Sequence, residues 1–143
     1  MLLLVVLMIS ACANKQIRLA VETSKQLNQG ESGMALPLVV RVYQLRNKDR
    51  LEQADFQSLW KNDQDVLGDD LVDRREFTLH PNAKKLIEVD RIEGAEYVAI
   101  MGLFRRPDDQ NKWREIHLLK GWGLTRRLMK IEAYDRKIEI VDY

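Results

Sequence analysis

The chain has 143 residues, enough for one folded domain, and its hydrophobic fraction of 45% and charged fraction of 31% are those of an ordinary globular protein rather than a disordered one. The net charge is +1, and the Lys and Arg residues are spread among acidic ones. Nucleic-acid binding needs a concentrated basic face, so composition and charge give no reason to expect a nucleic-acid partner.

The first eleven residues carry no charge and are mostly Leu, Val, Ile and Met. A helix of that length spans only about 16 Å, which is half a bilayer core and typical of the hydrophobic region of a signal peptide. Ile9-Ser10-Ala11-Cys12 follows, the arrangement that lipoprotein signal peptidase requires. The sequence therefore predicts a signal peptide at 1–11, lipidation of Cys12 and a short tether at 12–15.

Cys12 is the only cysteine, so no intramolecular disulfide is possible, and lipidation explains a lone thiol in an exported protein. Ala13 follows it, where an Asp would commonly retain a bacterial lipoprotein at the inner membrane. We therefore expect delivery to the periplasmic face of the outer membrane. The first predicted strand begins at residue 16, so the folded domain should lie close to the leaflet.

The first predicted strand covers residues 16–22, where Ile17, Leu19 and Val21 share one face. A polar, glycine-bearing loop follows at 24–33. The second predicted strand covers 37–45, because Pro37 can begin a strand and the residues behind it are β-branched and aromatic.

A helical insertion is predicted after this second strand. Residues 46–50 are polar and lead out of the sheet. The hydrophobic period then changes from two to about 3.6, since Phe56, Leu59 and Trp60 fall on one side of a short helix that Asp55 can cap. A further helical turn is expected at 65–68, and the whole insertion covers about 51–71.

Six more strands complete the predicted domain, which extends over 16–143. The stretch at 96–104 is apolar on both faces and is expected at the centre of a sheet, with 112–119 as its antiparallel partner. About eight short strands predict an all-β fold, a two-sheet β-sandwich; the pattern alone leaves a closed barrel open. The six strands are expected at 74–79, 84–89, 96–104, 112–119, 127–133 and 137–141.

The sequence shows few signs of catalytic or metal chemistry. His80 and His117 are the only histidines, and no hydrolase, metalloprotease or phosphate-loop motif is present. We therefore expect no enzyme, cofactor or metal. Trp60 and Trp113 are expected in the core, while Trp122 lies between glycines and is a candidate for contacts.

An acidic run at 63–73 raises the question of a calcium loop. Asp63, Asp65 and Gly68 match its start, but Leu67 and Arg74 occupy positions where ligands belong. We interpret the acids as helix caps and a solvated face. The run consists of Asp63, Asp65, Asp69, Asp70 and Asp73.

Three motifs resemble a known family. The patterns are R-V-Y-Q-L at 41–45, A-D-F-x-x-L-W-x-x-D at 54–63 and L-G-x-D-L at 67–71. Together they resemble the TssJ family, the outer-membrane lipoproteins of bacterial type VI secretion systems. The resemblance implies a transthyretin-like sandwich with added helices. It also implies a structural role, in which the protein binds the periplasmic C-terminal domain of the inner-membrane subunit TssM.

The resemblance further implies that the loop between the first two strands contributes to this contact. The loop is assigned by its position between strands, with Leu27 and Met34 as apolar anchors, and removing 26–33 is expected to leave stability unchanged. The alternatives are a periplasmic lipoprotein that binds a small ligand or glycan and, more remotely, a lipid-anchored hydrolase. The assigned contact residues are Gln26, Leu27, Asn28, Gln29, Gly30, Glu31, Ser32, Gly33 and Met34.

Overall fold

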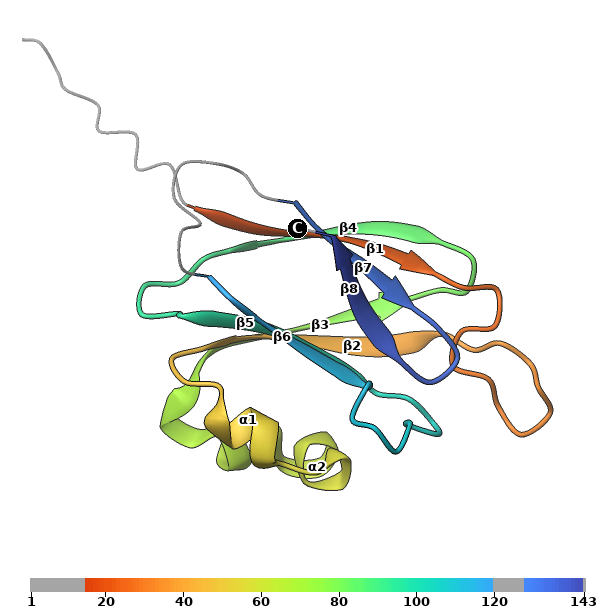
Figure 1. The fold of residues 1–143 in the computed structure, drawn as a ribbon, viewed down its shortest axis with the longest axis horizontal. Helices are drawn as coiled ribbons and strands as arrows, with labels where there is room; N and C mark the ends of the chain where they lie inside the picture. The colour runs from red at the N-terminus through yellow and green to blue at the C-terminus, as the bar shows by residue number, and fades with distance from the viewer. Residues whose placement is uncertain (1–14, 120–127, 143) are drawn as a thin grey trace, which may run out of the picture.

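The structure, a computed structural model, describes residues 15–119 and 128–142 (Figure 1). The predicted signal peptide at 1–11, the lipidation site Cys12 and Trp122 lie outside these residues, and their predictions stay untested. Over the described ranges, no helix is long and apolar enough to cross a bilayer.

The described residues form eight strands and three short helical segments. In chain order these are β1 (Gln16–Thr23), β2 (Leu38–Leu45), α1 (Asp49–Gln53), α2 (Phe56–Leu67), the 3-10 turn η1 (Gly68–Asp70), β3 (Leu71–Leu79), β4 (Lys84–Asp90), β5 (Tyr97–Gly102), β6 (Arg114–Leu118), β7 (Leu128–Ala133) and β8 (Ile138–Asp142).

The strands make two separate four-stranded sheets, in the orders β4-β1-β7-β8 and β3-β2-β5-β6. Neighbouring strands are antiparallel except for β1 and β7, which are parallel. The two sheets pack face to face, and α1 and α2 lie on the outer face of the second sheet as a third layer (Figure 1). The predicted two-sheet β-sandwich with a helical insertion after its second strand is confirmed, and the barrel alternative is wrong.

The core is formed by apolar side chains that alternate with polar ones along the strands. Ile17, Leu19 and Val21 of β1 are at most 1% exposed, as predicted. In β2, Val40 and Val42 face the opposite sheet, while the alternating side chains of Arg41 and Tyr43 face the helices. The core therefore has two parts, one between the sheets and one beneath the helices.

Strand β5 lies between β2 and β6, so both of its edges are paired within the sheet. Residues 98–101 are all buried, which confirms the prediction of a central strand made from its two apolar faces. Its antiparallel hairpin with β6 is also confirmed, and β7 and β8 form another antiparallel hairpin.

The helical insertion begins two residues earlier than predicted, because α1 starts at Asp49 inside the polar run. The predicted cap of α2 is confirmed: the Asp55 carboxylate accepts a hydrogen bond from the Ser58 backbone N–H at 2.9 Å. The helix is kinked at Asn62 (φ −152°) and ends at Gly68, whose φ of 51° favours glycine.

The prediction for Trp60 is wrong, since 48% of this residue is exposed. The buried side of α2 is formed by Leu59, Asp63 and Leu67, at a spacing of four, and Trp60 lies about 100° around the helix from Leu59. Trp113, by contrast, is 2% exposed and packs against Phe56 in an edge-to-face contact with ring centroids 5.2 Å apart.

Strand β3 begins at Leu71, three residues before the predicted start. Its first residues pair with the end of β2 across an irregularity between Gln44 and Leu45, and nothing in the alternation of 71–73 indicates this pairing.

Candidate partner-binding surface

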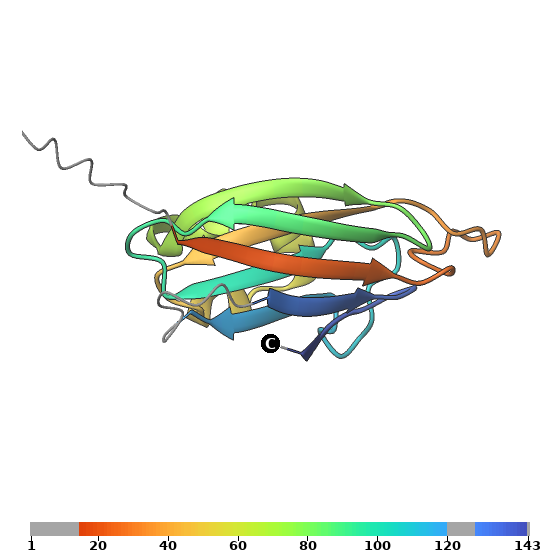
Figure 2. The ribbon, with the colours of Figure 1, turned by 90° about the horizontal axis from the view of Figure 1, so that it is seen from above.

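The loop between β1 and β2 lies at one end of the sandwich. Strand β1 leads to it from Gln16, and an eight-residue strand is about 26 Å long. The loop therefore projects from the end of the sandwich opposite the point where the chain enters β1 (Figures 1 and 2).

Backbone hydrogen bonds make the loop a narrow double-stranded projection. The Leu36 N–H donates to the Leu27 carbonyl, and the Gly30 N–H donates to the Met34 carbonyl, both at 3.0 Å. A turn between Gly30 and Gly33, closed by another 3.0 Å bond, forms the tip. The φ of Gly33 is 78°, a conformation that glycine adopts without strain.

Asn28 fixes the base of the loop. It is 5% exposed, and its amide donates to the Pro37 carbonyl and accepts from the Arg105 N–H, both at 2.9 Å. Its φ of 47° is one that Asn tolerates better than most residues. Next to it, the Gln29 N–H donates to the Asp135 carboxylate at 2.8 Å. The β1–β2 loop, the β5–β6 loop and the β7–β8 turn are thus held together.

The structure corrects the role predicted for Leu27. This residue is fully buried in the core and cannot contact a partner. Asn28 is buried as well, so both residues support the loop. Because a deletion of 26–33 would remove them, the expectation that it leaves stability unchanged is wrong.

The tip of the loop remains available for contact. Met34 is 65% exposed, an unusual exposure for a large apolar side chain. Of the other predicted contact residues, Gln29 is half-buried and Gly30 is buried. The exposed members of the set are Gln26, Glu31, Ser32, Gly33 and Met34.

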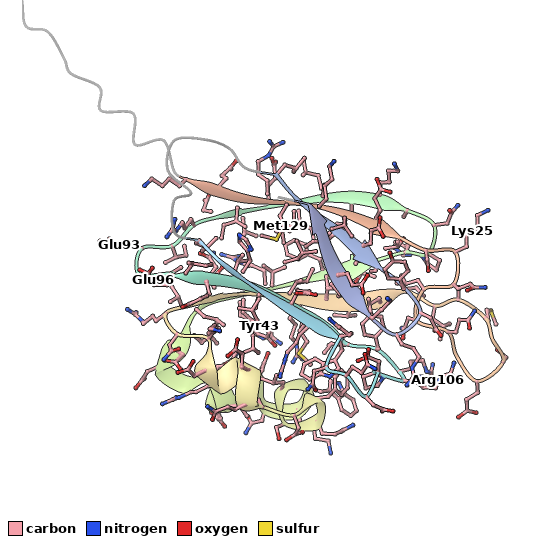
Figure 3. All side chains as sticks on the ribbon, viewed as in Figure 1. Lys25, Tyr43, Glu93, Glu96, Arg106 and Met129 are labelled. Atoms are coloured by element: carbon pink, nitrogen blue, oxygen red, sulfur yellow. The ribbon has the colours of Figure 1, made fainter. Side chains whose placement is uncertain are left out.

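Cations from a neighbouring loop lie beside the β1–β2 loop, and sequence reasoning did not find them. Arg105 and Arg106 are exposed beside it, and the Arg106 guanidinium reaches the Gln29 carbonyl at 3.5 Å (Figure 3 labels Arg106). Arg136 holds this loop by donating from Nε to the Arg106 carbonyl at 2.9 Å. An exposed thioether beside cations and polar groups is a surface suited to another protein.

A buried group of charges, also missed from sequence, holds the helices on the sheet. Asp63, expected on a solvated face, is 6% exposed. Its carboxylate accepts from the Tyr43 hydroxyl at 2.8 Å and from Arg74 Nε at 2.7 Å, and it lies 3.1 Å from Arg41 Nη1. Arg41 also donates to Glu76 at 2.8 Å. Each charge in this network therefore has a partner of opposite sign.

The network shifts the pKa of its members. Burial alone raises the pKa of the Asp63 carboxyl, but hydrogen bonds from Arg74 and Tyr43 and the charge of Arg41 outweigh it, so the pKa lies below the ordinary value. Burial, together with the Asp63 carboxylate, raises the pKa of Tyr43. Asp63 is thus ionised and Tyr43 neutral near pH 7.

Arginines also bind the carboxyl ends of the helices, where backbone carbonyls lack helical partners. Arg114 of β6 donates to the carbonyls of Leu51 at 2.5 Å and Ala54 at 2.7 Å. Arg50 donates to the Leu67 carbonyl at the end of α2, at 3.2 Å. Charge and hydrogen bonding, in addition to apolar packing, therefore fix the helical layer.

The histidines do not belong to a candidate metal site in the part of the chain that the structure describes. His80 is exposed and His117 half-buried, and the residues that the structure describes contain no group of three or more His, Cys, Asp or Glu able to hold a metal ion.

Comparison with known proteins identifies the family. The family model described as type VI secretion lipoprotein (VasD, EvfM, TssJ) matches residues 15–140. The chain belongs to the TssJ family. Among curated proteins, none matches the chain. Its membership confirms the family inferred from the three motifs.

Solved structures agree with this TssJ-family assignment. The type VI secretion lipoprotein TssJ1 from Pseudomonas aeruginosa is 28% identical, with a TM-score of 0.78 over 90% of this chain and 95% of that one. A chain of a type VI membrane complex is 22% identical, with a TM-score of 0.82 over 90% and 99%. A chain in a structure of the TssM C-terminal domain from EAEC is 21% identical, with a TM-score of 0.79 over 90% and 99%. The latter two show the shared fold.

In this TssJ-family protein, Asn28→Gly is expected to lower the free energy of unfolding by about 2 kcal/mol, because the Pro37 carbonyl and the Arg105 N–H each lose their partner. Glycine keeps the positive φ, so the change reports the side chain alone. Urea unfolding measures the effect, and amide hydrogen exchange at Leu36 should become faster. Unchanged exchange there would show that the loop keeps its shape without Asn28.

Proposed function

We propose that this protein is a structural tether of the type VI secretion membrane complex. It is anchored to the periplasmic face of the outer membrane by lipid on Cys12, and it holds the periplasmic C-terminal domain of TssM. Support comes from membership of the TssJ family and from the fold shared with chains in structures of a type VI membrane complex and of the TssM C-terminal domain.

The observation that carries this proposal is the position of the two functional ends. Cys12 precedes Gln16 by four positions, and an extended chain spans at most about 14 Å over that distance. The start of β1 is therefore held near the leaflet. The β1–β2 loop lies at the other end of the sandwich, where it meets a partner that approaches from the periplasm.

The proposed role is non-enzymatic. The buried charged side chains are engaged in holding the helical layer, as the Asp63 network shows. The alternative of a lipoprotein that binds a small ligand or glycan is an outcome of the test below.

Titration of the chain from Ala13 onward with the TssM C-terminal domain tests the proposal. We expect a dissociation constant in the micromolar range or below for the unchanged chain. Met34→Glu is expected to weaken binding at least tenfold, since it places a charge on the exposed apolar tip. The melting temperature should stay the same, because Met34 contributes nothing to the core.

The matched control is Gln57→Glu on α2, an exposed position away from the loop. Equal affinities for the unchanged chain and Met34→Glu would move the interface to another surface. Absence of binding at accessible concentrations would contradict the tether, and ligand screening would then test the alternative.

A further inference from the structure

On one long side of the sandwich, two sheet edges lie next to each other. Strand β4 ends one sheet and β3 ends the other. Seen from above, β3 forms the outer margin of the molecule on this side, and β4 lies inside it (Figure 2). The margin of the first sheet therefore lies inside that of the second, leaving a ledge over β3 beside β4.

Alternate backbone groups of β4 face this ledge. The Thr23 N–H donates to the Ala83 carbonyl and the Arg91 N–H to the Lys15 carbonyl, so odd-numbered residues from 83 to 91 pair with β1. Because the pairing alternates, the backbone groups of Lys84, Leu86 and Glu88 face away from β1. The Asp90 carbonyl, next in this series, accepts from the Gln44 side chain at 2.8 Å, which confirms the outward direction.

A groove follows the ledge. It consists of two hollows, of which the larger, about 580 Å³, is lined by residues of β3 and β4 that include Phe77 and Val89. The smaller, about 250 Å³, is lined by the next residues of β3, Thr78 and Leu79, together with Lys84 and Lys85 of β4. The Lys85 ammonium lies 5.8 Å from the centre of the Phe77 ring and donates to the Thr78 carbonyl. Lysine on an open edge is a common protection against indiscriminate strand pairing.

We propose that this groove accepts an extended segment of a partner protein as a fifth strand beside β4. The side chains on the outer face of β4 then determine its sequence, since cross-strand neighbours interact in pairs. Lys84 is 80% exposed, Leu86 48% and Glu88 43%. An antiparallel segment whose side chains complement these three residues has the sequence pattern basic–x–apolar–x–acidic. Its x side chains point into the groove over Phe77.

A second copy of this chain is a poorer occupant, although residues 84–88 themselves follow the same pattern. Strand β3 projects beyond β4 in every copy. If two copies paired through their β4 edges in one sheet, the projecting β3 strand of each copy would clash with the sandwich of the other. A flexible segment carries no such obstacle. This surface is on the long side of the sandwich, separate from the β1–β2 loop, and its test does not involve TssM.

The probe is the synthetic peptide acetyl-Thr-Lys-Val-Leu-Val-Glu-Thr-amide, added to the chain from Ala13 onward. We expect the amide protons of Leu86 and Glu88 to exchange at least tenfold more slowly at saturation, measured by NMR. The amides of Ile87 and Val89, already paired with β1, should not change. The same peptide N-methylated at its pairing amides should bind at least tenfold more weakly, as should the peptide with Lys and Glu exchanged.

Two sets of variants test the assignment within the protein. Leu86→Pro removes an N–H that faces the groove and no ladder bond, so it should abolish peptide binding, whereas Leu86→Ala should weaken it only a few-fold. The double variant Lys84→Glu with Glu88→Lys should prefer the charge-exchanged peptide. If Leu86→Pro fails to fold, the N-methylated peptide and the double variant still test whether the peptide pairs with β4.

Equal binding of the plain and N-methylated peptides would overturn the proposal. So would unchanged exchange at Leu86 and Glu88 in the presence of millimolar peptide. Slower exchange at these amides without peptide, increasing with protein concentration, would assign the edge to a second copy and overturn the partner segment.

Discussion

Asp63→Ala is expected to lower the free energy of unfolding by about 3 kcal/mol, the largest effect of a single substitution predicted here for stability. The change leaves the Arg41 guanidinium, whose side chain is 10% exposed, without the carboxylate 3.1 Å away. It also removes the acceptor of the Tyr43 hydroxyl. Urea unfolding followed by tryptophan fluorescence measures the loss. A loss below 1 kcal/mol would show that Glu76 and water compensate the buried cation.

Asp63→Asn tests the charge of this side chain apart from its shape, because the amide keeps the size of the carboxylate and one acceptor for the Tyr43 hydroxyl. The pKa of Asp63 is lowered in the folded protein, so the carboxylate contributes stability above its unfolded pKa of about 3.9, and this contribution disappears as the pH falls further. The stability difference between the unchanged chain and Asp63→Asn should therefore be constant from pH 5 to 7 and shrink below about pH 4. A difference that is undiminished at pH 3 would contradict the assignment to charge.

Cys12→Ser is expected to abolish membrane attachment while leaving the sandwich folded, the largest effect predicted on location. One acyl chain gives marginal anchoring and each further buried methylene adds about 0.8 kcal/mol, so losing all chains on the cysteine leaves nothing comparable. The fold should not change, since Cys12 precedes β1. Fractionation should find the variant in the soluble periplasmic extract, and its circular dichroism should match the lipid-free chain. A variant retained in washed outer membranes would contradict the lipoprotein assignment.

Ala13→Asp is the matched control for this experiment. It keeps the lipid and introduces the residue that commonly retains bacterial lipoproteins at the inner membrane. We expect the protein to remain membrane-bound but to move from the outer-membrane to the inner-membrane fraction. Unchanged location would show that residue 13 does not determine sorting in this protein.

The strands were largely predictable because their signals are local. Ile17, Leu19 and Val21 alternate with polar residues, and 98–101 is apolar on both faces; both features follow from the two-residue period of a strand. The Asp55 cap was predictable for the same reason, since it acts on the N–H three residues ahead. Errors arose where the pattern was ambiguous, as for Trp60, whose spacing from Phe56 fits the buried side of a helix equally well.

The candidate site was less predictable. Position between two strands indicated the β1–β2 loop, and the exposure of Met34 agrees with a contact role. The loop's polar appearance concealed the burial of Leu27 and Asn28. The bonds that hold it reach Arg105 and Asp135, 77 and 106 residues away along the chain. Spacing in the sequence carries no information about such pairs.

By itself, the sequence determined the strands, the helical insertion and the family, because periodicity, caps and short motifs each operate over a few residues. Lipidation of Cys12 stays a prediction. Only the tertiary structure decided that Asp63 is a buried ion-pair partner and not a solvated acid, since its burial depends on Arg41 and Arg74 arriving from two other strands. It also decided that β3 projects past β4 and leaves an open edge. The physical reason is the same in both cases: burial and edge pairing are set by which distant segments pack together, and that packing is a property of the whole fold.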